Sequence, residues 1–553
     1  MEKMKWWGWG SEEIAFTHED KPGLRGFFAR VLEIDVRAAP TTTTTTAFAE
    51  LEVPVPALPP ALRWALEAAV GAEHVSIDDR QRVLHARGKS LRDLVRHRAG
   101  DVGRVPDVVV RPGDEQAVVG VLRAVLANDA VLIAFGGGTS ISGSLEAPAG
   151  ETRPVVSVDL GRLDRVLALD EVSRLARVQA GVFGPALEQQ LGARGWTAGH
   201  FPDSFAHSTL GGWIATRSSG MQSDKYGDIA DLTRAVRMVT PTGVLATRPV
   251  PSASTGPSVR EMVLGSEGRL GIITEATIHV HRVPPRRTIL GYLLPDWPRA
   301  LAAMRELSEA EVSPSVTRVS DAHETQFSLA TRKRPTVGDR IASAALALYL
   351  RRRAIDAEQM CLSFIGYEGS QRHVREQRRR VGAIVGRHGG LSIGSSPGRL
   401  YDQKKFDTPY IRDFLLDRGV LADVSETSAP WRALGTLYDS TVAAAQGAFT
   451  ELGVTGYVMC HLSHSYHSGA CLYFTFALKP SGRRAPLQEY DVVKSAIQQA
   501  FVDNAATLSH HHAVGTEHAR WLEEDISAPG VAMVRALLDG VDPGRNLNPG
   551  KIA

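Results

Sequence analysis

The chain has 553 residues, of which 43% are hydrophobic and 22% charged, a composition typical of a globular protein with more than one domain. Its formal net charge of +2 gives no strong basic field, so the sequence argues against a nucleic-acid partner. Three cysteines without CxxC spacing exclude a disulfide framework, and the absence of an apolar bilayer-length run or a signal-peptide core predicts a cytoplasmic protein.

The first predicted unit, residues 1–101, is an N-terminal segment that is partly helical. The threonine run at 41–46 is typical of a solvated loop, because polar tracts of low complexity bury little surface. Further along, PALRWALEAAVG has the apolar spacing of a helix and ends at Gly71, a residue type that favours helix C-termini.

Residues 102–282 alternate short strand-like runs with amphipathic helices. PDVVVRP, AVLIAF and VVSVDL are predicted strands, and DEQAVVGVLRAVLAND is a predicted helix. Residues 283–500 form the next predicted unit, with helices such as PRALAAMRELSEAE and strands such as CLSFIGYEG and ACLYFTFAL. Residues 501–553 carry three adjacent histidines. The whole pattern predicts an α+β fold.

Three glycine-rich elements fall within residues 102–282. The first, at 130–144, places GGG directly after a buried strand, where bare backbone N–H groups can approach an anionic ligand. The second, at 200–229, is dense in small and hydroxyl residues, and the third, at 263–278, spaces glycines before a strand. Taken singly, the first element is equally well explained as a tight turn, since it matches neither GxGxxG nor the P-loop, and the second is better explained as a surface loop.

Together the three elements resemble the FAD-binding domain of the vanillyl-alcohol oxidase-like (PCMH-type) flavoproteins. Within that superfamily the chain is similar to the alkyldihydroxyacetone-phosphate synthases (alkylglycerone-phosphate synthases). The similarity extends from MKWWGWG through PDSFAHSTLGGWIATRSSGM, DTPYIRDFLLDRGVLADVSETSAPW and GACLYF to SHHH. It implies a two-part FAD-binding domain at 102–282, an α+β cap domain with an antiparallel sheet at 283–500, and a C-terminal segment at 501–553 that packs back on the FAD domain.

The resemblance implies FAD contacts in four stretches. They are Ala134, Phe135, Gly136, Gly137, Gly138, Thr139 and Ser140; Asp203, Ser204, Phe205, Ala206, His207, Ser208 and Thr209; Thr216, Arg217, Ser218 and Ser219; and Glu267, Gly268, Arg269, Leu270, Gly271, Ile272 and Ile273. Many superfamily members attach FAD through a histidine near the first glycine loop. Because AFGGGTSISG contains no histidine, we expect non-covalent FAD.

The histidine triplet has several interpretations on its residues alone. On a strand, His510 and His512 would point one way and His511 the other, so the three do not easily face one ion. A zinc site and a chance surface cluster both stay open. The resemblance implies instead that all three line the flavin pocket without a metal, with His512 as the expected proton-handling member.

Three further residues are candidate catalytic groups through the resemblance. Tyr473 alone would be taken for a core aromatic, but the family pattern makes it the acid/base at the substrate carbon. A phenol with an ordinary pKa of about 10 needs a cationic neighbour for that role. Arg412 alone would be a solvated or salt-bridged residue; the pattern implies an electrostatic role for it, with Arg318 in support.

The chain departs from the family pattern in two places. Ala513 stands after the triplet where the family usually has glycine, so we expect a stiffer loop. His461 stands where animal members carry arginine, and it brings His464 and His467 into the same stretch. Those histidines either belong to a surface strand or alter recognition of the substrate head group.

A basic amphipathic stretch lies at 331–355, TRKRPTVGDRIASAALALYLRRRAI. It is either a buried helix with charged ends or an interfacial helix whose cations meet anionic lipid head groups. Since a lipid-metabolising enzyme would benefit from the second arrangement, we expect contact with a membrane surface, at its inner face.

The resemblance implies an FAD-dependent transferase of ether-lipid synthesis. It would replace the acyl chain of acyl-dihydroxyacetone phosphate with a long-chain alcohol, through a covalent adduct at flavin N5, and the enzyme could form a homodimer. An FAD-dependent D-2-hydroxy acid dehydrogenase or oxidase, of the D-lactate or glycolate type, is the alternative on the same fold. A non-catalytic lipid-binding flavoprotein is a third hypothesis.

Overall fold

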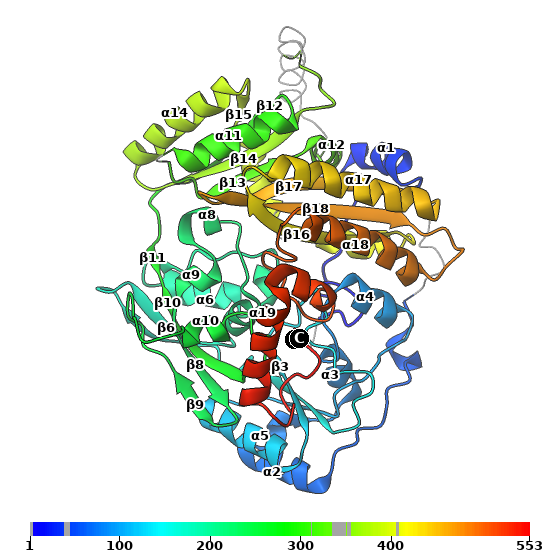
Figure 1. Cartoon of the computed structure of the whole chain (residues 1–553), viewed down its shortest axis with the longest axis vertical. Helices are drawn as coiled ribbons and strands as arrows, with labels where there is room; N and C mark the ends of the chain where they lie inside the picture. Colours follow the sequence, from blue (N-terminus) through cyan, green and yellow to red (C-terminus); the bar gives the residue numbers. More distant parts are fainter. Residues whose placement is uncertain (1–3, 38–44, 311, 334–349, 351–354, 405–408) are drawn as a thin grey trace.

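The structure, a computed structural model, describes residues 4–37, 45–310, 312–333, 350, 355–404 and 409–553. It has the predicted α+β fold, with an FAD-binding part below and a cap domain above in Figure 1. The strands and helices predicted from the quoted stretches are present. Most of the threonine run at 41–46 and most of the stretch at 331–355 lie outside the described residues.

The FAD-binding part contains two main sheets and a small ribbon. The four-stranded sheet has the order β1-β2-β4-β3, and the five-stranded sheet has the antiparallel order β5-β6-β10-β8-β9. The strands are β1 (Val75–Ser76), β2 (Val108–Val110), β3 (Val131–Phe135), β4 (Val155–Asp159), β5 (Val166–Asp170), β6 (Leu175–Gln179), β8 (Thr233–Thr240), β9 (Gly243–Ala246) and β10 (Ile272–His279), with β7 (Trp196–Thr197) and β11 (His281–Arg282) as the ribbon.

Local sequence explains why the glycine-rich loop that follows β3 lies at the site. Helix α5 (Glu115–Ala127) begins at Asp114, whose side chain accepts the Ala117 N–H, and it packs apolar residues on the first sheet. Strand β3 pairs in parallel with β4, and both are buried. In parallel sheets such strands are nearly continuous runs of apolar residues, as here, and the loop after each strand carries the polar chemistry.

The remaining helices of this part are short. They are α2 (Pro60–Val70), α3 (Asp79–Leu84), α4 (Leu91–Arg98), α6 (Gly184–Gly192), α7 (Leu210–Thr216), α8 (Ser223–Tyr226), α9 (Ile229–Leu232) and α10 (Val259–Val263), with the 3₁₀ turns η1 (Phe48–Glu50), η2 (Ala72–His74) and η3 (Phe205–His207). Helix α2 packs on α5, so this stretch of the N-terminal segment belongs to the FAD-binding part.

The cap domain is a seven-stranded antiparallel sheet in the order β15-β12-β14-β13-β17-β18-β16. Its strands are β12 (Arg287–Leu294), β13 (Val316–Ser320), β14 (Cys361–Glu368), β15 (Leu391–Gly394), β16 (Leu421–Pro430), β17 (Thr455–Ser465) and β18 (Gly469–Lys479). Its helices are α11 (Trp297–Glu309), α12 (Ala322–Ala330), α14 (Gln371–Arg387), α15 (Ser396–Lys404), α16 (Tyr410–Leu416), α17 (Leu434–Leu452) and α18 (Pro486–Asp503).

Alternation along β18 separates the core of the cap from the cavity. Leu472 and Phe474 join the hydrophobic core with α17 and α18, whereas Tyr473 and Thr475 line the cavity between the two parts. Side chains two apart on a strand share a face, so this period of two decides which residues can reach a ligand.

The chain ends join the two parts. Helix α1 (Pro22–Val31) packs against α12 and β17 of the cap, although it belongs to the N-terminal segment. After η4 (Ala519–Trp521), helix α19 (Leu522–Val541, red in Figure 1) runs along the FAD-binding part, and Leu547 then pairs with Leu132 of β3. Within the part of the chain that the structure describes, none of the helices combines the length and hydropathy that a membrane crossing needs.

Candidate active site

A cavity of about 1480 Å³ lies between the FAD-binding part and the cap. The glycine-rich loop after β3 lines one side of it, and β16, β17 and β18 line the other. Ordinary small-molecule sites enclose roughly 300–1,000 Å³. This cavity therefore has room for a large cofactor together with a long substrate.

The glycine cradle, which we define as residues 134–140 together with residues 207–209, lies on one side of the cavity, and all of these residues except His207 line it. A Cβ on Gly136 would lie 2.3 Å from Thr209 Oγ1, and a Cβ on Gly137 would lie 1.6 Å from the His207 carbonyl oxygen. Only glycine allows the two backbone segments to approach this closely, and backbone bare of side chains can in turn contact an anionic ligand.

Most of the predicted FAD contacts lie on the cavity wall. Those that line it are Ala134, Phe135, Gly136, Gly137, Gly138, Thr139, Ser140, Asp203, Ser204, Ser208, Thr209, Thr216, Ser218, Ser219, Glu267, Gly268, Gly271 and Ile273. Those that do not are Phe205, Ala206, His207, Arg217, Arg269, Leu270 and Ile272. Arg217 is instead paired with Glu261, and Leu270 lies in the hydrophobic core.

Glu267 connects the glycine cradle to the C-terminal segment. Its carboxylate accepts the backbone N–H groups of Val514 and Gly515 at 3.0 Å, and the hydroxyl of Ser144. Asn548 donates from its side-chain amide to the backbone carbonyls of Ser144 and Glu267. The C-terminal segment thus packs back on the FAD-binding part, and it fixes the loop that carries the triplet.

Three neighbouring strands present one row of functional side chains. Glu426 of β16 lies opposite Tyr473 of β18, and Tyr473 lies opposite His461 of β17. Directly paired residues project from the same face of a sheet. The rings of His461 and Tyr473 stack with their centroids 4.8 Å apart.

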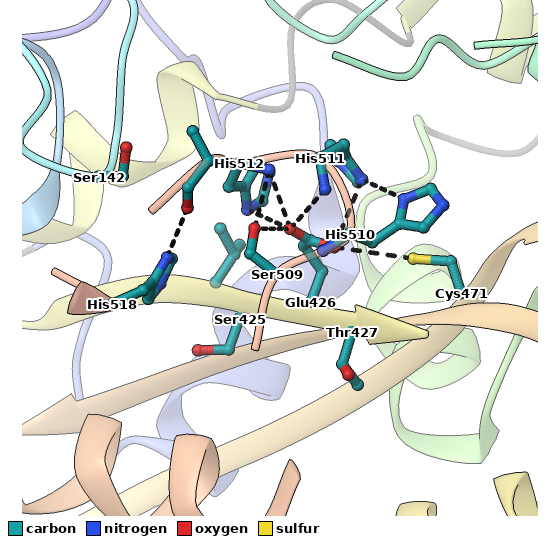
Figure 2. Close-up of polar contacts among 12 residues, drawn as sticks. Ser142, Ser425, Glu426, Thr427, Cys471, Ser509, His510, His511, His512 and His518 are labelled. Atoms are coloured by element: carbon teal, nitrogen blue, oxygen red, sulfur yellow. Dashed lines mark hydrogen bonds and ion pairs between the residues drawn. The ribbon is translucent and has the colours of Figure 1, made fainter. Parts of the chain in front are cut away.

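The triplet loop, residues 509–512, is neither a strand nor a helix; it wraps around the Glu426 carboxylate, as Figure 2 shows. The backbone N–H groups of His510, His511 and His512 all donate to Glu426, at 2.8, 3.0 and 3.0 Å. Ser509 adds its hydroxyl at 2.9 Å. Glu426 therefore fixes the backbone of all three histidines.

This wrapping directs the three rings differently. His511 and His512 line the cavity, with ring centroids 6.0 and 5.5 Å from that of Tyr473. His510 is outside the cavity lining and contacts Tyr466 instead, with Nε2 2.6 Å from the phenol oxygen. The structure thus brings two triplet members to the predicted pocket and places the third behind them.

Burial sets the protonation of the row. It lowers the pKa of His511 to about 3 and of His512 to about 4, although the adjacent Glu426 carboxylate acts in the opposite direction. Burial also raises the pKa of Tyr473 well above its ordinary value, and the Asp203 and Glu426 carboxylates add to this. His511 and His512 are therefore neutral, and Tyr473 is a protonated phenol that can donate.

Glu426 itself is ionised. Burial opposes this, but the three triplet histidines and their N–H groups hold the pKa of Glu426 well below its ordinary value. Cys471 and two of the histidines come close enough to Glu426 for their ligand atoms to lie within 4.8 Å of one another, in the manner of a metal site. The carboxylate oxygens already accept the triplet N–H groups, however, so we assign this cluster to holding the loop.

Arg318 lies at the edge of the same row. Its guanidinium donates to Glu324 at 2.7 Å and to His461 Nδ1 at 3.2 Å. Burial opposes ionisation of Glu324, but His461 and Arg318 lower its pKa to about 2. His461 is 5% exposed, so the histidine that departs from the family pattern is part of the cavity wall.

Arg412, on α16, lines the cavity beside β16, whereas Arg318 lies on β13 at the other end of the row. Its Nη1 lies 4.0 Å from Asp423, and its buried Nε has no hydrogen-bond partner among the described residues. A buried donor without a partner is unfavourable unless a ligand accepts from it. Arg412 is therefore placed to meet an anionic or polarised ligand atom.

Sequence reasoning missed four residues of the site: Glu426, Glu324, Tyr466 and Asp228. Glu426 lies inside a quoted stretch, where an acid in a strand of small residues was a usable signal. The other departure, Ala513, adopts φ +71. His467, which lies in the same stretch as His461, is exposed at the β17–β18 turn, away from the row.

The cavity fits FAD. The glycine cradle presents backbone without side chains on the cavity wall, and the buried Oδ1 of Asn548, on the same wall, lacks a donor among the described residues. Backbone N–H groups and such single polar atoms are what a diphosphate with a polar chain requires. The FAD binding domain family matches residues 106–247, and the family described as FAD linked oxidases, C-terminal domain, matches residues 283–552.

Whole-chain relatives agree with these matches. The chain is 36% identical to alkyldihydroxyacetonephosphate synthase of Dictyostelium discoideum, over all of this chain and 93% of that one. It is 31% identical to the synthase of Trypanosoma brucei brucei, over all of this chain and 92% of that one. A solved structure of an alkyldihydroxyacetonephosphate synthase superposes with a TM-score of 0.86 at 34% identity, covering 100% of this chain and 99% of that chain.

Proposed function

The chain belongs to the alkyldihydroxyacetonephosphate synthase family of FAD-dependent enzymes, and on that premise we propose that it exchanges the acyl chain of acyl-dihydroxyacetone phosphate for a long-chain alcohol. The products are an alkyl ether of dihydroxyacetone phosphate and a free fatty acid. The reaction needs a proton taken from the substrate carbon, departure of the carboxylate, bonding of the alcohol oxygen to the same carbon with loss of the alcohol proton, and return of a proton to the carbon.

One observation carries the proposal: polar groups and an apolar wall share one cavity. Tyr473, His511 and Arg318 line it together with the glycine cradle. On the cap side, the same cavity is lined by Phe27 and Phe28 of α1, within an apolar cluster that includes Phe414. Such a wall is suited to a long hydrocarbon chain, which a 2-hydroxy acid substrate lacks.

The chain's own residues have distinct roles in this reaction. FAD, when bound, supplies the electron sink. Neutral His511 and His512 offer bare ring nitrogens that can take the proton from the substrate carbon, while protonated Tyr473 can donate to an oxygen of the substrate. Arg412 and Arg318 stabilise negative charge where it develops.

The test is incubation of the FAD-loaded protein with palmitoyl-dihydroxyacetone phosphate and labelled hexadecanol. We expect labelled ether product, release of palmitate, and flavin that is still oxidised after turnover. A folded, yellow enzyme that forms no labelled ether overturns the proposal. If D-lactate bleaches the flavin under anaerobic conditions, the result favours the alternative hypothesis, a D-2-hydroxy acid dehydrogenase.

We also propose that the enzyme works at the inner, cytoplasmic face of a membrane, through residues 331–355, and forms a homodimer. Support comes from the flanking arginines and apolar centre of that stretch in the sequence and from the lipid nature of the proposed substrates. Flotation with vesicles that contain about 30% anionic lipid tests the first part. Sedimentation of the holoenzyme tests the second.

A further inference from the structure

A continuous chain of hydrogen bonds runs from the FAD-binding part to the cavity. Asp228, next to α9, accepts the Tyr466 phenol at 2.8 Å. The Tyr466 oxygen lies 2.6 Å from His510 Nε2, and His510 Nδ1 lies 2.9 Å from His511 Nδ1. His511 lines the cavity. Two of these contacts, Asp228–Tyr466 and Tyr466–His510, join segments far apart in the sequence, and the third joins neighbouring residues of the triplet.

In each hydrogen bond of this chain the donor and the acceptor can be assigned, and every proton points toward Asp228. The Asp228 carboxylate can only accept, because burial is outweighed by His464 and His510 and its pKa falls to about 2. The Tyr466 hydroxyl donates its single proton to Asp228. Its oxygen must therefore accept from His510 Nε2–H. In the tautomer that donates from Nε2, the His510 ring has a bare Nδ1, which accepts from His511 Nδ1–H. Neutral His511 is left with its bare Nε2.

The proposed function needs His511 to accept a proton, but the buried position of His511 makes a positive charge on its ring unfavourable. Burial lowers the pKa of His511 to about 3, so a positive charge confined to that ring is disfavoured. A base in this position gains strength if the charge can move to a neighbour that faces a carboxylate. His511 Nδ1 itself lies 3.4 Å from Glu426, but the oxygens of that carboxylate already accept the three triplet N–H groups. His510 reaches a second carboxylate, because only the Tyr466 hydroxyl lies between it and Asp228.

We propose that Tyr466 and Asp228 position the triplet as a proton relay, in which His511 is the base and His510 holds the charge. His511 Nε2 takes the proton from the substrate carbon, and the C–H electron pair stays with the substrate. The Nδ1 proton of His511 passes to His510 Nδ1, so the cation forms opposite Asp228. The same steps run backwards when a proton returns. This inference rests on the proposed function.

The decisive variant is Tyr466→Phe, which removes one oxygen atom. We expect kcat to fall about 10- to 100-fold with KM for the acyl substrate within about twofold, since an orienting group acts on the chemical step. Deuterium incorporation from D2O into the substrate carbon, without added alcohol, should fall by the same factor. FAD content should not change.

Tyr438→Phe is the matched control. Its phenol also donates to a buried carboxylate, Asp321, at 3.0 Å, but neither residue lines the cavity. It should match wild type in kcat. Asp228→Asn keeps an acceptor for Tyr466 and removes the charge, so we expect a fall of about 10-fold. If both relay variants equal Tyr438→Phe in kcat and exchange rate, the relay is wrong, even though wild type makes ether product.

A spectroscopic measurement judges the relay independently of activity. In enzyme labelled with 15N-histidine, two-bond correlations distinguish a bare Nε2 from a protonated one, and His511→Gln assigns the signal. We expect bare Nε2 at His511 in wild type and a mixture of tautomers in Tyr466→Phe. Protonated Nε2 in wild type overturns the relay. An inactive wild type with the expected tautomers would instead overturn the proposed function.

Discussion

The glycine cradle and the triplet loop form facing walls of one cavity, but they are built in opposite ways. The cradle acts through the absence of side chains: Gly137 faces the His207 carbonyl where a Cβ would lie 1.6 Å away. The triplet loop acts through a buried carboxylate, Glu426, that accepts three successive backbone N–H groups. The first wall depends on shape and the second on charge. Substitutions in the cradle should therefore impair FAD binding, whereas substitutions at Glu426 should impair turnover.

The largest effect should come from Gly137→Ala. The added methyl group meets backbone, which cannot rotate away, so we expect destabilisation of more than about 3 kcal/mol and loss of FAD during purification. Thermal unfolding and flavin absorbance measure both. Gly192→Ala in α6, where a Cβ meets nothing within 4 Å, is the control and should retain FAD. A yellow, stable Gly137→Ala protein contradicts the account of the cradle.

Glu426→Gln tests the wall that depends on charge. The amide can neither carry the charge nor accept at both atoms, so we expect a loss of about 2–4 kcal/mol in the free energy of unfolding. Turnover should fall about 100-fold while FAD stays bound, because the histidine backbone loses its anchor. Glu489→Gln, a buried acceptor for Ser481 away from the cavity, should lower stability without lowering turnover.

The difference in the free energy of unfolding between wild type and Glu426→Gln should depend on pH, and the sign of this dependence can be predicted. The folded pKa of Glu426 is depressed, whereas in the unfolded chain a glutamate titrates near 4.3. Its contribution is therefore fully present above about pH 5 and decreases as pH falls through the folded pKa. Denaturant unfolding should show wild type and Glu426→Gln converging toward low pH. A gap that stays constant below about pH 4 would falsify the assigned ionisation.

Arg412→Lys tests whether the cavity also needs a planar cation. Lysine keeps the charge but lacks the Nε–H that Arg412 holds buried without a partner among the described residues. We expect turnover to fall about 100-fold, with FAD retained. Arg418→Lys is the control, since its guanidinium donates to the backbone oxygens of Val36 and Phe414 outside the cavity. Equal turnover in the two variants would remove Arg412 from the machinery.

The same contrast explains what the sequence could predict. Residues 134–140 of the cradle are contiguous, and strand periodicity followed by GGG locates them. Tyr473 and the triplet came from resemblance to a family, not from pattern. Glu426, Tyr466 and Asp228 were missed because their role exists only after β16, the β17–β18 hairpin and the start of α9 meet the triplet loop. Local patterns carry no information on such pairings between distant segments.

The smallest effect concerns the residue after the triplet. Ala513 adopts φ +71, in the region where a Cβ is unfavourable, and its carbonyl accepts from His518 at 2.8 Å. Ala513→Gly relieves that strain, and we expect the free energy of unfolding to rise by about 1 kcal/mol. Urea denaturation of the holoenzyme measures it. Arg174→Gly, at φ +56 in the FAD-binding part, gives the same relief away from the cavity. If Arg174→Gly stabilises and Ala513→Gly does not, the triplet loop, rather than Ala513 itself, sets that backbone angle.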